Sequence, residues 1–192
     1  MKTIAASFFC LLVLFGQFPL MPQGHDSPID HVDRGIRIWV EGENIWVAYQ
    51  IQVSERMALM QLHAMDINGD GAVSDEERDV FFERFYAMLK PQIELELNGQ
   101  KIELKPALKV QFLPQFHQIF TFSGAIGKLT EKKMNGQFMD SYSRNYPGDY
   151  RWDGPKVDTG LGPQVKVTED PKTADLQGRH SMLVIKFEIV SP

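Results

Sequence analysis

The chain has 192 residues, of which 43% are hydrophobic and 23% are charged. This length and composition are typical of a globular protein with a packed core, built as one domain or as one domain with an insertion. The formal net charge is −5 and there is no run of lysine or arginine, which argues against nucleic acid and anionic membrane surfaces as partners.

The N-terminus has the pattern of a targeting segment. Lys2 supplies a short positive region, and residues 4–18 are almost wholly apolar. We expect a signal peptide over residues 1–24, with cleavage near Gly24. An uncleaved membrane anchor is the alternative, because the apolar stretch approaches the length that spans a bilayer. Either way the rest of the chain is expected to be extracytoplasmic, periplasmic or secreted. Cys10 is the only cysteine, so residues 25–192 contain neither a thiol nor a disulfide.

The first structural pattern after this segment is a β-hairpin. Apolar residues alternate with polar ones over residues 36–40 and again over 45–53, and the residues between them have turn-forming character. The second strand leads directly to Ser54, a residue type that often caps a helix N-terminus. A helix is therefore predicted over residues 55–65.

Residues 66–77 read DINGDGAVSDEE and have the spacing of a calcium-binding loop. Ca²⁺ takes six to eight oxygen ligands, and a loop of this kind supplies them from positions 1, 3, 5, 7, 9 and 12, with glycine at position 6 for a sharp turn. The glycine here is Gly71. The predicted ligands are Asp66, Asn68, Asp70, the backbone carbonyl of Ala72, Ser74 and Glu77.

Asp and Asn are also common in ordinary turns, but a turn alone requires neither the oxygen side chain at position 9 nor the glutamate at position 12. The flanking residues favour the calcium loop, because apolar side chains recur at helical spacing on both sides. They are Leu59, Leu62 and Met65 before the loop, and Phe81, Phe82, Phe85 and Leu89 after it. The second helix is predicted over residues 75–90 and ends at Pro91. Its aromatic density predicts burial on more than one side. The stretch resembles the EF-hand superfamily at every ligand position, with Arg78 as a departure.

The remainder of the chain is predicted to be rich in strands. Asn98-Gly99 between alternating segments indicates a type I′ hairpin that places Leu95 opposite Ile102 and Ile93 opposite Leu104. Further strands are expected at residues 108–113, 116–122, 137–143, 165–168 and 181–190. Residues 124–136 and 145–162 are expected to form loops.

These patterns predict an α+β fold: a single β-rich, sandwich-like domain over residues 25–192, with an EF-hand helix–loop–helix inserted at about residues 54–90. We find no second calcium loop and no internal repeat. Because EF-hands usually work in pairs, the helices are expected to pack on the sheet or on a second copy of the chain, so a homodimer through this unit is possible.

The order of elements from residue 36 to about residue 104 also resembles a family of uncharacterised bacterial periplasmic proteins associated with nickel or zinc transport. In that family a β-hairpin leads into a helix, a D-x-[DN]-x-DG loop, a second helix and a strand that ends in an Asn-Gly or Asp-Gly turn. The resemblance implies an extracytoplasmic accessory protein that serves a membrane transporter of nickel, zinc or cobalt.

The leading functional hypothesis is a calcium-binding module without catalytic activity. Three carboxylates in one loop and an outside location predict weak affinity, with Kd on the order of 10⁻⁴–10⁻³ M, and hence a structural ion. A sensor is the alternative, because Met57, Met60, Met65 and Met88 could line an adaptable apolar groove. The simpler prediction is that these methionines belong to the core.

The sequence also allows two other functions, transition-metal binding and catalysis. His25, Asp26 and His31 could offer ligands to Ni²⁺ or Zn²⁺, although histidines in a flexible N-terminus are usually only solvated. His63, His117 and His180 share no ligand spacing and are expected to be structural. No phosphate loop, zinc-protease motif, nucleophile elbow or catalytic cysteine is found. The 140–153 region holds Asp, Tyr, Arg and Trp, a composition that suits a sugar or peptide site and equally an ordinary ordered loop.

Overall fold

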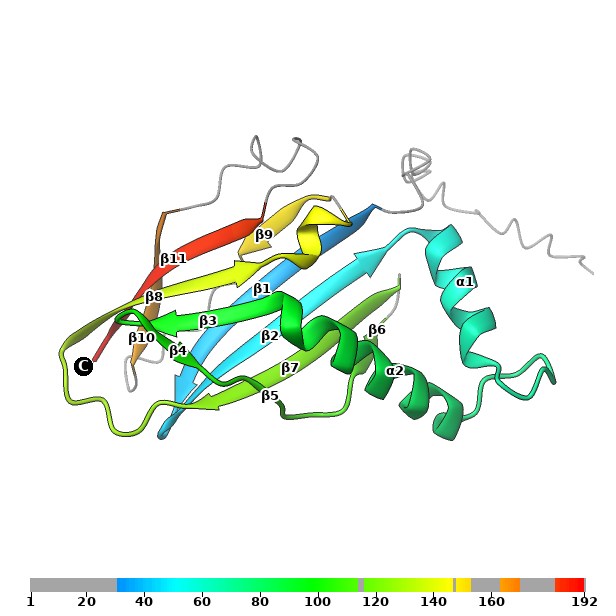
Figure 1. Cartoon of the computed structure of the whole chain (residues 1–192), viewed down its shortest axis with the longest axis horizontal. Helices are drawn as coiled ribbons and strands as arrows, with labels where there is room; N and C mark the ends of the chain where they lie inside the picture. The colour runs from blue at the N-terminus through cyan, green and yellow to red at the C-terminus, as the bar shows by residue number, and fades with distance from the viewer. Residues whose placement is uncertain (1–30, 114–115, 147, 153–162, 170–181, 192) are drawn as a thin grey trace, which may run out of the picture.

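A computed structural model describes residues 31–113, 116–146, 148–152, 163–169 and 182–191. It is a strand-rich α+β fold with two β-sheets and two α-helices among these residues (Figure 1). The elements in chain order are β1 (Val32–Glu41), β2 (Asn44–Val53), α1 (Glu55–Met65), α2 (Asp75–Leu89), η1 (Lys90–Gln92), β3 (Ile93–Leu97), β4 (Gln100–Ile102), β5 (Lys105–Pro106), β6 (Gln111–Leu113), β7 (His117–Ala125), β8 (Lys133–Asp140), η2 (Tyr142–Arg144), β9 (Tyr150–Trp152), β10 (Gln164–Glu169) and β11 (Leu183–Val190).

The first sheet has the strand order β5-β7-β2-β1-β9, and β6 also pairs with β7. The second sheet has the order β10-β11-β8-β3-β4. Neighbouring strands run antiparallel in both sheets, except that β9 lies parallel to β1. The predicted fold class is confirmed at the level of a β-rich α+β fold with two sheets.

The β1–β2 hairpin forms in the register that its alternation predicts. The ladder runs without interruption from the Val32–Val53 pair to the Glu41–Asn44 pair, and Gly42 takes a positive φ of 62° in the turn. One face of each strand is buried because alternate side chains of a strand point to the same side of the sheet. The buried side chains are Val32, Arg34, Ile36, Ile38, Ile45, Val47, Tyr49, Ile51 and Val53.

The buried face of the first sheet is covered by two different layers. Over part of it lies the second sheet, where the ring of Tyr49 meets that of Phe138 at a centroid distance of 6.4 Å. Over the rest lies α2, whose Tyr86 ring packs against Phe120 and Phe122 at 5.1 and 5.2 Å. The Tyr86 hydroxyl also accepts a hydrogen bond of 3.0 Å from the backbone N–H of Thr121. Helix α2 is thereby fixed to β7 by both apolar and polar contacts.

A charged pair lies buried between the sheets. Arg34 Nε on β1 is 2.9 Å from Asp140 Oδ2 at the end of β8, and both side chains are almost fully excluded from solvent. Tyr49 donates a hydrogen bond of 2.8 Å to the same carboxylate oxygen. The two Arg34 terminal nitrogens donate to the backbone carbonyls of Val32 and Tyr146. The pair therefore joins strands of both sheets and has its polar atoms satisfied.

In the chain, α1 and α2 follow β2 and precede β3. Helix α1 lies beyond the end of β2 (Figure 1). The predicted cap of α1 is confirmed, since Ser54 Oγ accepts a hydrogen bond from Met57 N at 3.2 Å. Helix α2 ends at Leu89, and Pro91 lies in the short η1 helix that leads into β3. Among the described residues, no helix is long and apolar enough to cross a membrane.

The predicted burial of apolar residues in the helices is only partly correct. Met65 is buried and Met57 packs against the core, but Met60 and Met88 are exposed, so the prediction that all four methionines are core is wrong. Leu59 and Leu62 of the predicted stripe are also exposed, by 58% and 37%. The physical reason is that α1 turns Ala58 and Met65 toward the core, and this leaves the Leu59 side of the helix facing solvent.

The second half of the chain contains more strand than its sequence predicts. Strand β8 begins at Lys133, within the predicted 124–136 loop, and ends at Asp140, where η2 replaces the last predicted strand residues. Strand β9 lies within the predicted 145–162 loop, and its register with β1 pairs Arg34 with Tyr150. The predicted Leu95–Ile102 pair forms and is the last pair of the β3–β4 ladder, so the predicted Ile93–Leu104 pair is wrong. Predictions for residues 1–24 and 153–162 lie outside the described residues.

Candidate metal centre

The 66–77 stretch connects the two helices and includes the first turn of α2. Asp66 caps the end of α1, where its backbone N–H donates to Leu62 O at 3.2 Å. Gly69 and Gly71 have positive φ values of 73° and 85°, a region that costs glycine little because it has no Cβ. The predicted turn at Gly71 is thus confirmed, and the chain makes a second one at Gly69.

The side chains predicted as ligands at positions 1, 3 and 5 turn into the loop. Asp66 Oδ1 accepts hydrogen bonds from the backbone N–H groups of Gly69 at 2.8 Å and Asp70 at 3.1 Å, and its Oδ2 accepts from Gly71 at 2.9 Å. Asn68 Oδ1 accepts from the same Asp70 N–H at 2.8 Å. Because one N–H serves both side chains, the oxygens of Asp66 and Asn68 lie close together.

Glu77, predicted as the ligand at position 12, bridges the two ends of the loop. Its Oε1 accepts hydrogen bonds from Ile67 N at 2.9 Å and Asn68 N at 3.1 Å. Its Oε2 accepts from Ser74 N at 3.0 Å and Ser74 Oγ at 2.8 Å. In return, the Glu77 backbone N–H donates to Ser74 Oγ, which completes a capping box at the start of α2. The structure therefore brings Glu77 to both Ser74 and the first turn of the loop.

These contacts lower the pKa of the Glu77 carboxyl, first through the hydrogen bond from the Ser74 backbone and then through that from its hydroxyl. A group with a lowered pKa in the folded state stabilises the protein fully above its unfolded pKa and loses that contribution as the pH falls through the folded value. In chelator, we expect Glu77→Gln to lower the unfolding temperature at pH 7 and the difference from the unchanged protein to shrink in acid. Thermal unfolding from neutral pH to pH 3 measures this, and a difference that is constant across the range would contradict it.

The donor atoms suit a hard cation. The six predicted ligands offer oxygen only, with formal negative charge from Asp66, Asp70 and Glu77, and Ca²⁺ prefers such oxygens to nitrogen or sulfur. No three His, Cys, Asp or Glu side chains converge as a metal-holding group within the described part of the chain. The carboxylates of Asp66, Asp70 and Glu77 are thus not gathered around one point in this structure. The Glu77 oxygens are engaged with backbone N–H groups. The donor set fits the ion, and Glu77 would have to exchange hydrogen-bond partners to hold it.

The histidines do not assemble a second centre among the described residues. His31 Nε2 lies 2.8 Å from Asp33 Oδ1, while His117 Nδ1 lies 3.1 Å from Gln50 Nε2. His63 is exposed on α1. Predictions for His25, Asp26 and His180 lie outside the described residues.

Asp140 and Tyr142 of the 140–153 region form a buried cluster with Arg34 and Tyr49 that the sequence analysis does not predict. Asp140 and Tyr142 are buried, and the Arg34 guanidinium lies 5.6 Å from the Tyr142 ring centroid. Burial of Tyr49 raises the pKa of its hydroxyl well above its usual value. One signal was present in the sequence: Arg34 occupies an inward position in the alternation of β1 and so requires a buried partner.

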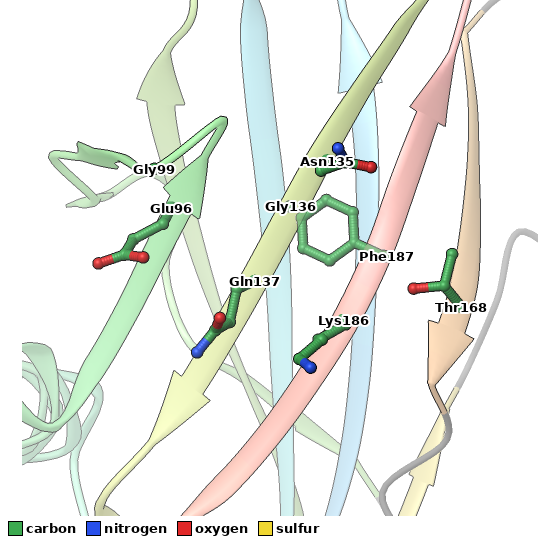
Figure 2. Close-up of a pocket in the computed structure, with 8 residues that line it drawn as sticks. All are labelled: Glu96, Gly99, Asn135, Gly136, Gln137, Thr168, Lys186 and Phe187. Atoms are coloured by element: carbon green, nitrogen blue, oxygen red, sulfur yellow. The ribbon is translucent and has the colours of Figure 1, made fainter.

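A shallow groove of about 260 Å³ lies on the outer face of the second sheet, across β3, β8, β11 and β10 (Figure 2). Apart from Phe187, its side chains are polar. The one cation among them, Lys186, forms an ion pair of 2.9 Å with Glu169. The ring of Phe187 fills the space at Gly136, where a Cβ would meet ring atoms at 2.2 Å. The lining residues are Glu96, Gly99, Asn135, Gly136, Gln137, Thr168, Lys186 and Phe187.

No protein-family model matches this chain, and no curated protein matches it.

Proposed function

We propose that the protein is an extracytoplasmic calcium-binding protein of the EF-hand type, in which the ion stabilises the α1–loop–α2 unit. One observation carries this proposal: the oxygen-rich side chains at positions 1, 3 and 5 all turn into a loop that the carboxylate at position 12 closes. The extracytoplasmic location is inferred from Lys2 and the apolar 4–18 segment.

A structural role follows from how the loop is connected. Glu77 belongs to the first turn of α2, and α2 is held against β7 by Phe82, Phe85 and Tyr86. Bound Ca²⁺ would supply positive charge that offsets the repulsion between the three loop carboxylates. Without the ion, the hydrogen bonds that offset this repulsion among the described residues come from backbone N–H groups of the loop and from the Ser74 hydroxyl. The proposed role is thus to fix the loop between two helices, one of which packs on the sheet.

Calcium is expected to raise the unfolding temperature of the protein. An ion that binds only the folded state at ten times its Kd adds about 1.4 kcal/mol of stability, which is a shift of a few degrees for a chain of this size. Thermal unfolding of chelator-treated protein, with Ca²⁺ or Mg²⁺ added in the millimolar range, measures the shift. Asp70→Ala should abolish it.

The control is Asp75→Asn, because Asp75 carries the same charge within the 66–77 loop, is exposed, and is not a predicted ligand. This variant should keep most of the shift. If both variants lose the calcium-induced shift equally, stabilisation by calcium depends only on the negative charge of the region, and the proposed site is wrong.

A further inference from the structure

Three Asn-Gly steps occur in the chain: Asn68–Gly69, Asn98–Gly99 and Asn135–Gly136. Such a step is prone to deamidation, because glycine has no side chain to hinder attack by its own backbone nitrogen. That nitrogen, after losing its proton to solvent, bonds to the Asn side-chain carbonyl carbon, and the side-chain nitrogen leaves as ammonia. Water then opens the cyclic imide to aspartate or to isoaspartate. All three asparagines are exposed, so the local structure decides which of them reacts.

Asn98 is held at both ends of its side chain. Its Nδ2 donates to Glu131 Oε2 at 3.0 Å, and its Oδ1 accepts from Asn135 N at 2.9 Å. Its backbone N–H also donates to Asn135 O at 2.7 Å. Ring closure at Asn98 has to turn the side chain and would break both side-chain bonds.

Asn135 and Gly136 lie inside β8, with β11 on one side and β3 on the other (Figure 2). Ring closure needs the Gly136 nitrogen to approach the Asn135 side chain, which an extended strand does not permit. Asn135 pairs with Glu188 of β11, and Gly136 pairs with both Phe187 of β11 and Leu97 of β3. The backbone would have to leave these ladders for the ring to close, and openings of paired strands are rare compared with those of exposed loops.

Asn68 is less restrained in its side chain, although its backbone N–H donates to Glu77 Oε1 at 3.1 Å. Its Oδ1 accepts one hydrogen bond, from Asp70 N at 2.8 Å, and its Nδ2 has no hydrogen bond to any described residue. The Gly69 N–H donates to Asp66 Oδ1 at 2.8 Å within the same exposed loop. Both bonds lie in a segment that is outside the sheets and open to water.

We propose that Asn68 is the site at which this protein deamidates spontaneously in its folded state. The reaction itself does not depend on the metal, but its consequence rests on the proposed function. Conversion to aspartate places a fourth carboxylate in the predicted ligand set. Conversion to isoaspartate adds a methylene group to the main chain between positions 3 and 4, which displaces the later ligands relative to Asp66.

The test is peptide mapping by mass spectrometry of the intact chain, stored at neutral pH in chelator. We expect deamidation at Asn68 to be at least about tenfold faster than at Asn98 and Asn135, because their extra contacts must open first. In denaturant the three rates should converge, since each step is then a flexible Asn-Gly pair. Equal rates in the folded protein, or a faster rate at Asn98 or Asn135, would overturn the proposal.

A parallel sample in millimolar Ca²⁺ separates this inference from the proposed function. If Asn68 Oδ1 is a calcium ligand, the ion should slow deamidation at Asn68 and leave Asn98 and Asn135 unchanged. If Asn68 reacts fastest but calcium has no effect on it, the deamidation site stands and the calcium site is contradicted. The Asn68→Asp variant identifies the aspartate product in the map.

Discussion

Asp140→Ala is expected to destabilise the protein by about 3–5 kcal/mol, because it leaves Arg34 charged and buried without its counter-ion. The Arg34 and Asp140 side chains are 1% and 0% exposed, so solvent cannot replace the lost partner. The substitution also removes the acceptor of the Tyr49 hydroxyl and of the Ser143 N–H, which lies 3.2 Å from Asp140 Oδ1. Urea unfolding measures the change in free energy.

The double variant Arg34→Met/Asp140→Leu is the informative control, because replacing both charges of a buried pair by apolar groups is often close to neutral. It should recover a large part of the stability lost in Asp140→Ala. Glu188→Ala, which breaks the partly exposed ion pair with Lys133 (2.7 Å), is expected to cost no more than about 1 kcal/mol. A loss below about 1 kcal/mol in Asp140→Ala would contradict the importance of the buried pair.

Phe120→Ala is expected to cost about 3–5 kcal/mol, since it opens a cavity in the contact between β7 and α2. The ring is fully buried and meets Phe85 at 4.9 Å, Tyr86 at 5.1 Å and Phe82 at 5.9 Å. These three residues span the face by which α2 lies on the sheet. Unfolding in urea measures the loss of free energy. Relative to the unchanged protein, hydrogen exchange should accelerate more in α2 than in β8.

Ile119→Ala is the matched control, because Ile119 is the next residue along β7 and points to the opposite face, where it is half-buried. It should cost less than half as much and leave exchange in α2 unchanged. Similar effects of both substitutions would show that α2 does not depend on the Phe120 contact.

The elements predicted best are those whose local chemistry is sufficient to determine them. The β1–β2 hairpin has strict alternation, and Asn98 and Gly99 both take the positive φ values, 47° and 77°, that a type I′ turn requires. The cap at Ser54 follows from a hydrogen bond within four residues of the chain. Such features need no knowledge of distant contacts.

The elements that were missed depend on distant partners. Strand β9 has three residues and gains its pairing only from β1, more than a hundred positions earlier in the sequence. The start of β8 reads as a loop because Asn135 and Gly136 are turn-forming types, yet it pairs with two neighbours and accommodates the Phe187 ring at the glycine. The exposure of Leu59 depends on which side of α1 meets the sheet, and helical spacing does not reveal this.

The sequence predicts the residues of the candidate calcium site, which stays a prediction, and it does not predict their contacts. The spacing from Asp66 to Glu77 matches that of a calcium loop, and the Asp66, Asn68 and Asp70 side-chain oxygens accept hydrogen bonds from backbone N–H groups of the loop. The spacing says nothing of the hydrogen bonds that Glu77 accepts from Ile67 and Asn68. In the proposed site, Ca²⁺ would therefore compete with these two N–H groups for the Glu77 carboxylate.

Calorimetric titration of the chelator-treated protein with Ca²⁺, beside Glu77→Gln, tests the calcium proposal most directly. We expect one site per chain, with Kd on the order of 10⁻⁴–10⁻³ M, that disappears in Glu77→Gln. Glu83→Gln, an exposed glutamate of the same helix, should bind like the unchanged protein. Absence of calcium binding, or binding that persists in Glu77→Gln, would contradict the assignment of residues 66–77 as a calcium site.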